Sequence, residues 1–131
     1  MDDITVHVEV AISPTESEGK VRQAVENIFG PMKTQTRPLH KGHLLIADAK
    51  GQESLTKLRG LLQREHIRAA ARTVFIHGLE SESISFCLNK QVAFAGHVSF
   101  ATEENESPLG PIQVEIKKEN PRQIIEYLTA Y

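Results

Sequence analysis

Apolar and polar residues alternate at the start of the chain. From residue 4 to residue 12 every second side chain is a large aliphatic one: Ile4, Val6, Val8, Val10 and Ile12. A period of two is typical of a strand with one buried face. The sequence therefore predicts a half-buried β-strand here.

A helix signal follows directly in the segment SPTE. Ser13 can cap a helix, Pro14 suits the first helical position, and Glu16 can close a capping box. Beyond it, apolar residues recur at helical spacing: Val21, Ala24, Val25 and Ile28. Gly30 and Pro31 then end the pattern. We expect a helix that opens at Pro14 and ends before Gly30.

The pattern of residues 31–76 predicts a connection, a strand and helical segments. Residues 31–42 are polar and hold two prolines and a glycine, so we interpret them as a connection. HLLIAD at 43–48 predicts a short buried strand, and 52–65 a helix with leucines on one side. Residues 67–76 predict a further helix. The pattern leaves open whether it continues the preceding helix or breaks from it near His66.

Strand patterns return in the second half. We predict three strands, at 83–89, 97–101 and 112–116. An acidic loop, ATEENESPLGP, lies between the last two. Asn120 is expected to cap, and Pro121 to open, a C-terminal helix. The order of elements predicts one α+β domain over residues 1–131. Its single-layer sheet is largely antiparallel or mixed, with helices packed mainly on one face.

The stretch LNKQVAFAGHVSF, residues 88–100, interrupts an apolar period of two with Lys90 and Gly96. An isolated glycine in a strand pattern favours a turn or a close approach of two elements. We therefore expect Lys90 and Gln91 at a bend between strand segments. There they can serve structure or contact a ligand.

Aromatic residues offer little for reading bases. Phe94 and Phe100 share the parity of Val92 and Val98, so regular strand geometry sends their rings to the core. The chain has no Trp, two Tyr and five Phe. Any RNA contact is therefore expected to rest on phosphate, 2′-hydroxyl and shape.

The formal net charge is -2, but the charges are unevenly distributed. From Lys33 to Arg72 nine Lys and Arg stand against three acids, a balance of +6. If residues 64–72 form one continuous helix, Arg64, Arg68 and Arg72 make a stripe, with Lys57 close to it. Such a stripe can follow phosphates. The alternative is a solvated helix face with weak local ion pairs.

Motifs for catalysis or metal binding do not occur. There is no P-loop, dinucleotide fingerprint, CxxC, HExxH or EF-hand loop. Six scattered histidines favour neither a metal nor a cofactor, and the single cysteine, Cys87, predicts a buried thiol. We expect no enzyme, although a small-molecule sensor or enzyme stays a third alternative. No apolar run approaches a membrane span, and the acidic start lacks secretory features, so we expect a cytoplasmic protein.

Several stretches resemble a known family. They are VAISPTESEGKVRQAVENIF, IRAAARTVFIHGLE, ISFCLNKQVAFAGHVSF and PLGPIQVEI, in that order along the chain. The most specific are SPTE…KV, NKQ-x-A-x-x-G and PLGPI. Together they resemble an uncharacterised archaeal family with a suspected RNA-binding domain. That family's fold is similar to the large-subunit ribosomal protein that binds 5S RNA. The segment IRAAAR departs from the family pattern where we expect an acid, which adds positive charge there. The resemblance implies a ribosomal-protein-like α+β fold and a suspected RNA-binding role.

The leading hypothesis is an RNA-binding accessory protein of translation or RNA processing, which contacts phosphates through a basic face. Its proposed RNA-binding residues are Lys57, Arg64, Arg68, Arg72, Lys90 and Gln91. The alternative is a protein-interaction module, a homodimer or part of a protein complex, without direct RNA contact. It would use the small residues between the apolar ones of 92–100: Ala93, Ala95, His97 and Ser99.

Overall fold

The fold is one antiparallel sheet covered by helices on one face. A computed structural model describes residues 3–101 and 110–130. The strands are β1 (Thr5–Ile12), β2 (Lys33–Pro38), β3 (His43–Lys50), β4 (Ser83–Leu88), β5 (Phe100–Ala101) and β6 (Ile112–Lys117). Their order across the sheet is β2-β3-β1-β6-β4-β5, and every neighbouring pair is antiparallel. The α+β prediction with a largely antiparallel sheet is therefore confirmed.

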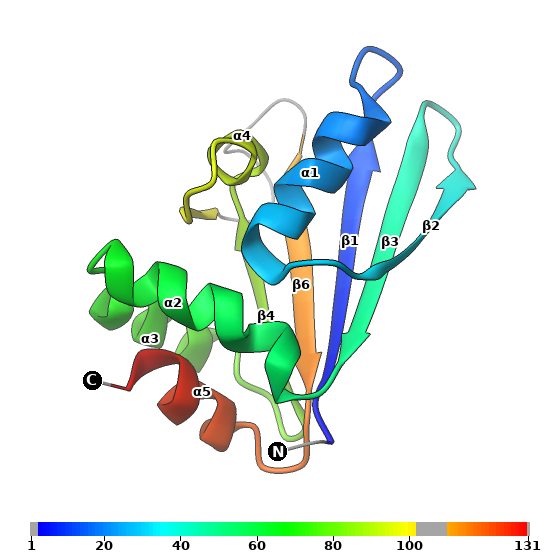
Figure 1. The fold of residues 1–131 in the computed structure, drawn as a ribbon. Coiled ribbons are helices and arrows are strands. Elements are labelled where there is room, and N and C mark those ends of the chain that lie inside the picture. The colour runs from blue at the N-terminus through cyan, green and yellow to red at the C-terminus, as the bar shows by residue number, and fades with distance from the viewer. Residues whose placement is uncertain (1–2, 102–109, 131) are drawn as a thin grey trace.

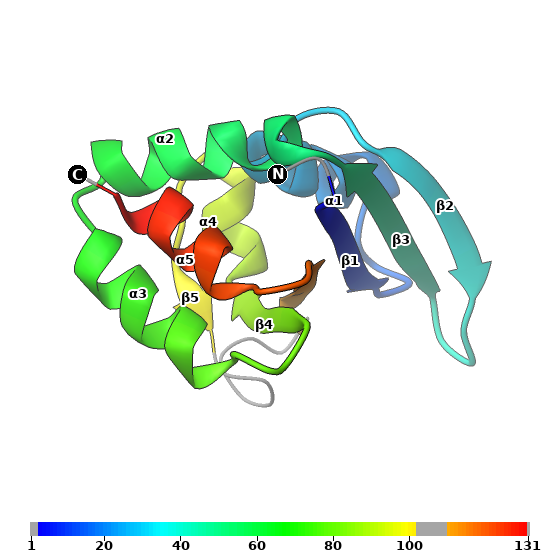
Figure 2. The same cartoon turned by 90° about the horizontal axis from the view of Figure 1, so that it is seen from below.

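The helices lie together on one side of this sheet. They are α1 (Glu18–Phe29), α2 (Thr56–Arg64), α3 (Arg68–His77), α4 (Lys90–Phe94) and α5 (Arg122–Thr129), with a 3-10 turn, η1, at Gln52–Leu55. Figure 1 shows α1 in front of β1 and β6, with α2 and α5 below it. Figure 2 shows α3 beside the edge formed by β4 and β5. Within residues 3–101 and 110–130, no helix covers the opposite face of β2, β3 and β1.

The core lies between the sheet and the helices. Alternate residues of β1, from Ile4 to Ile12, are buried as the period of two predicts. α1 and α5 bury their helical-period aliphatic residues against them. Phe75 packs with Phe86 and Phe100 at ring-centroid distances of 5.0 and 5.7 Å. The expectation that Phe100 packs toward the core is confirmed.

The polar segment 31–42 holds a strand, so its prediction as a connection was wrong. β2 pairs with β3 from Lys33↔Asp48 to Pro38↔His43. Its side chains are exposed except Thr34, which is half-buried. An edge strand with no buried apolar side chain leaves no hydrophobic period in the sequence. Lysine, arginine and proline on the edge are also typical of strands that avoid pairing with another chain.

The first helix begins later than predicted, at Glu18. Ser13 and Glu16 still interact, because the Ser13 N–H donates to Glu16 Oε1 at 2.9 Å, but they close a separate turn. Ser17 is the actual cap, and its Oγ accepts from the Lys20 N–H. At the other end of the chain, Asn120 has φ 56° and makes no side-chain cap, so its expected role was also wrong. Pro121 takes the cap position of α5.

Residues 88–100 contain a short helix where a bend and a strand were expected. Asn89 caps α4 by accepting from the Val92 N–H at 2.9 Å. Gly96 follows with φ 89°, so the turn predicted at this glycine is confirmed. The strand predicted at 97–101 shrinks to the two residues of β5. Because α4 replaces strand geometry, the parity argument fails for Phe94, whose side chain is 46% exposed rather than in the core.

Candidate nucleic-acid interface

The predicted arginine stripe is interrupted by a chain reversal. α2 ends at Arg64 and α3 starts at Arg68, and between them His66 has φ 57°. A positive φ in a residue other than glycine breaks a right-handed helix. The sequence left open a break near His66, and the structure shows one. Arg64 therefore belongs to a different helix from Arg68 and Arg72.

Arg68 and Arg72 contact the C-terminal helix. The Arg68 Nη1 donates to the Ala130 carbonyl at 3.0 Å. The Arg72 Nη2 donates to Glu126 Oε1 at 2.9 Å, and its Nη1 reaches Thr129 Oγ1 at 3.4 Å. These bonds join α3 to α5, and the carbonyl contact also satisfies an acceptor at a helix C-terminus. Both arginines thus have a structural role that the sequence did not indicate.

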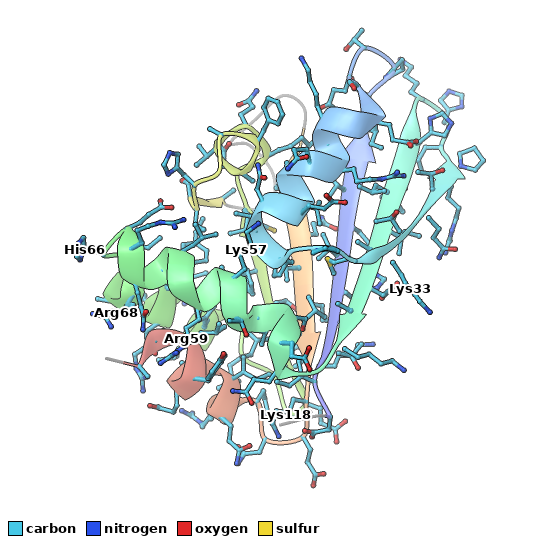
Figure 3. The ribbon with its side chains drawn as sticks, viewed as in Figure 1. Lys33, Lys57, Arg59, His66, Arg68 and Lys118 are labelled. Carbon is cyan, nitrogen blue, oxygen red and sulfur yellow. The ribbon has the colours of Figure 1, made fainter. Side chains whose placement is uncertain are left out.

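Lys57 likewise forms a contact between two helices, α2 and α1. Its Nζ donates to the Glu26 carbonyl at the end of α1 at 3.1 Å. Nearby, Arg59 Nε donates to the Tyr127 carbonyl at 2.9 Å, and its guanidinium lies 5.0 Å from the Tyr127 ring. Figure 3 labels both cations on α2. Arg64 differs from them, since it is exposed and makes no ion pair or side-chain hydrogen bond within the described ranges.

Lys90 is buried, with 4% of its surface exposed. Its Nζ donates to the Ala11 carbonyl at 2.7 Å and to Glu16 Oε1 and Oε2 at 3.1 and 3.2 Å. The ammonium thus holds α4 against the end of β1 and the turn before α1. Gln91, one position later, is exposed. The six RNA-binding residues predicted from the sequence therefore do not form one surface. Lys57 lies where α2 meets α1, and Lys90 and Gln91 lie in α4. Arg64 ends α2, while Arg68 and Arg72 contact α5.

The hairpin formed by β2 and β3 carries a different group of cations. Across residues 33–50 the only acid is Asp48, against four cations: Lys33, Arg37, Lys41 and Lys50. All four are exposed, and none makes an ion pair or side-chain hydrogen bond with a described residue. We call residues 33–50 the cationic hairpin. Because these cations need not break internal contacts, they can meet an anion directly.

Strand register places three of these cations on one surface. Lys33 pairs with Asp48 and Arg37 with Leu44, while Lys50 pairs with Thr5 of β1. These residues stand on the face of the sheet opposite the helices, because the alternate positions of β1 and β3 fill the core. Figure 3 shows the Lys33 side chain pointing away from the helices at the β2 edge. Lys41 lies in the turn of the hairpin.

Gly42 fixes that turn against β1. It has φ 78°, and a Cβ placed there would lie 2.0 Å from the Ile12 carbonyl oxygen. Only glycine combines that backbone conformation with so close an approach. The tip of the cationic hairpin is therefore held beside Ile12 and Ser13, at the end of the sheet where α1 begins.

The face of the sheet opposite the helices, which we call the open face, is acidic at its centre, in contrast to the cationic hairpin. His7 Nδ1 lies 2.7 Å from Asp48 Oδ1, and its Nε2 lies 3.1 Å from Glu9 Oε2. Partial burial lowers the pKa of His7, but the hydrogen bonds to the two carboxylates outweigh it and leave the pKa above its ordinary 6.5. A hollow of about 990 Å³ lies here, and Glu9 and Glu115 line it. Carboxylates repel an anionic group, so this part of the open face is less suited to a polyanion than the hairpin.

The hairpin cations are not among the RNA-binding residues predicted from the sequence, although the segment with a charge balance of +6 contains them. Lys33, Gln35 and Arg37 alternate with Thr34 and Thr36, which is a strand period carried by polar residues. That alternation is the signal from which the strand and its charged face could have been predicted.

Among the described residues, no group of three or more His, Cys, Asp or Glu could hold a metal. Over the same residues, no helix is both long and apolar enough to cross a bilayer.

Comparison with known proteins assigns the family. A family model described as RNA binding matches residues 5–118. A UPF0201 protein of Pyrobaculum arsenaticum is 45% identical over 94% of this chain and 87% of its own length. One of Sulfolobus acidocaldarius is 40% identical over 95% and 86%. The crystal structure of the UPF0201 protein of Methanococcus jannaschii superposes with a TM-score of 0.86 at 29% identity, covering 95% of this chain and 98% of that one. The likeness to a 5S-RNA-binding ribosomal protein stays a prediction, which these comparisons do not test. The chain belongs to the family described as RNA binding and to the uncharacterised archaeal UPF0201 proteins.

Proposed function

We propose that this protein binds RNA and that the cationic hairpin contacts the phosphate backbone. The observation that carries the proposal is the set of four exposed cations on one hairpin, which form no ion pair with a described residue and face a single acid within the hairpin. That acid, Asp48, is itself engaged with His7. The match of residues 5–118 to a family described as RNA binding supports the same conclusion.

The chemistry of the hairpin suits phosphate. Arg37 can donate two parallel hydrogen bonds to one phosphate, while the three lysines act as point charges. Each phosphate contact releases counterions, and it adds roughly 0.7 to 0.9 to the salt slope of log affinity. Such contacts set affinity and orientation but read no sequence.

Two of the residues predicted from the sequence remain in the proposal. Arg64 and Gln91 are exposed and make no side-chain hydrogen bond with a described residue. Lys57, Arg68, Arg72 and Lys90 instead join elements of the fold. A phosphate would have to compete with those bonds, so we place its contacts on the hairpin.

The cellular setting that we propose is translation or RNA processing, as an accessory protein without catalysis of its own. Transfer and ribosomal RNA are therefore the first RNAs to test. With 4-thiouridine-substituted RNA, photo-crosslinking and mass spectrometry should identify attached peptides within residues 33–50. Crosslinks confined to α2, α3 and α5 would contradict the placement, and no crosslink above that of an acidic control protein would contradict RNA binding.

The structure removes the observation behind the homodimer alternative. That alternative assumed a strand at residues 92–100 with small residues on one face. The segment instead starts with α4, and Ala93 is 1% exposed, with Asn27 of α1 bonded to its carbonyl. A helix of the same chain thus covers part of the expected face. A homodimer or protein complex stays a prediction, which light scattering would test.

A further inference from the structure

A second hollow, of about 330 Å³, lies between α4 and the start of α1. We call it the α1–α4 hollow. Its wall includes Val21, Phe94, Lys20, Ser17 and Gln91. Its volume is at the small end of the range for ligand sites, which suits one planar group rather than a long ligand. The proposed phosphate contacts on the hairpin do not use it.

Phe94 is an exposed ring on a fixed backbone. Its side chain is 46% exposed, although the chain has few aromatic residues to leave in solvent. Asn27 Nδ2 donates to the carbonyls of Ala93 and Phe94 at 3.0 and 3.1 Å. Gln23 in turn donates to Asn27 Oδ1 at 2.7 Å. The end of α4 is therefore tied to α1, so the ring's attachment point does not need to be ordered on binding.

Polar groups suited to a nucleotide surround this ring. Lys20 Nζ lies over the ring at 5.9 Å from its centroid, at the outer limit of a cation–π contact, so a base that stacks on this face must displace the ammonium. The exposed Gln91 offers a donor and an acceptor on one amide. The buried Lys90–Glu16 pair also lines the hollow and joins its two sides.

The hollow and the tip of the cationic hairpin lie at the same end of the sheet. The hairpin tip is packed on Ile12 and Ser13 through Gly42, and Ser17 of the hollow follows four residues after Ser13. Figure 1 shows α4, the start of α1 and the β2–β3 turn along one edge of the molecule. Lys41 lies in this turn, so one strand of RNA that passes around the hairpin tip can contact both the hollow and the cations on the opposite face.

We propose that the α1–α4 hollow takes one unstacked nucleobase of single-stranded RNA, which stacks on Phe94. Lys20 then meets the phosphate of that nucleotide, and the Gln91 amide bonds to an edge of the base. Stacking on an aromatic ring tolerates any base, so the site favours single strands over duplexes rather than one sequence. The inference rests on the proposed RNA binding and adds to it a preference for unpaired RNA.

The test uses the full chain and two 12-nucleotide probes. One is oligouridylate, and the other has the same length and charge with abasic residues at its centre. Native protein should bind the first more tightly, by about 5-fold or more for one stacked base. Phe94→Ala should remove this difference while the salt slope stays unchanged, because the phosphate contacts remain. Ile76→Ala is the matched control, since Ile76 is also 46% exposed but lies on α3.

A fluorescent substitution reports the stacking itself. The chain contains no Trp, so Phe94→Trp places a single indole in the hollow. Its fluorescence should be quenched by oligouridylate and much less by the abasic probe. Equal affinity of native protein for both probes, or an unquenched indole at saturation, would overturn the base site and leave the hairpin proposal standing. If native protein binds neither probe, the proposed function fails and the base site with it.

Discussion

At the scale of single residues, Lys90 shows how a sequence anomaly can be structural. It interrupts an apolar period because it begins a helix, and its buried ammonium is matched by Glu16 and the Ala11 carbonyl. Burying a charge is costly unless it is paired and hydrogen-bonded. The pair therefore holds α4, with the ring of Phe94, against the start of α1.

Removal of one partner should be strongly destabilising. Glu16→Ala leaves the Lys90 ammonium buried without its carboxylate, and the expected loss is about 3 kcal/mol or more in the free energy of unfolding. Glu18→Ala is the control, because Glu18 makes an exposed pair with Arg22, worth only about 0.5 kcal/mol. Urea unfolding followed by circular dichroism would measure both. Equal losses in the two variants would contradict a structural role for Lys90.

His7 should make stability depend on pH. Its pKa in the folded protein lies above 6.5 because of Asp48 and Glu9. The stabilisation by these contacts is then fully present below pH 6.5 and is lost as pH rises through the folded pKa. His7→Gln should therefore cost more stability at pH 6 than at pH 9, in thermal unfolding at constant ionic strength. His40→Gln, an exposed change in the hairpin turn, is the matched substitution for comparison, and a larger cost for His7→Gln at pH 9 than at pH 6 would refute the assignment.

At the scale of elements, a helix or strand could be predicted from the sequence where its buried residues are apolar and recur in a recognisable pattern. β1, β6, α1 and α5 each bury one face, and their apolar spacing predicted them. β3 was predicted from its apolar run, and Leu45, Ile46 and Ala47 are all buried. β2 buries no apolar side chain, so its strand character and its cations were missed. α4 was missed because five residues are too short for a helical period to appear. The same two elements explain what was missed at the candidate site. The sequence predicted a basic segment, but it predicted neither the individual phosphate contacts on β2 nor the exposure of Phe94 on α4.

The hairpin turn gives a prediction at this scale. Gly42→Ala combines a φ of 78° with a Cβ only 2.0 Å from the Ile12 carbonyl, so it should detach or distort the hairpin tip. We expect a loss of stability of about 1–3 kcal/mol and weaker RNA binding. Gly60→Ala meets nothing within 4 Å inside α2, and it should be stabilising by up to about 1 kcal/mol. If both variants unfold at the same temperature, the assigned role of Gly42 is wrong.

At the scale of the whole molecule, the near-neutral chain divides into surfaces of different charge. The cationic hairpin lies beside the acidic centre of the open face, and several other cations are used to join helices. The hairpin tip and the α1–α4 hollow share one end of the sheet. We infer that RNA extends from the phosphate contacts on the hairpin to this end, where one base stacks on Phe94.

The central claim is most directly tested by the salt dependence of binding to transfer RNA. Four phosphate contacts predict a slope of log affinity against log salt of roughly -2.8 to -3.6. The double variant Arg37→Gln with Lys41→Gln should lower its magnitude by about 1.5. The control, Arg72→Gln with Arg122→Gln, removes the same charge from α3 and α5 and should leave the slope unchanged. Equal changes in both double variants, or affinity of the native protein that does not vary with salt, would contradict RNA binding through the cationic hairpin.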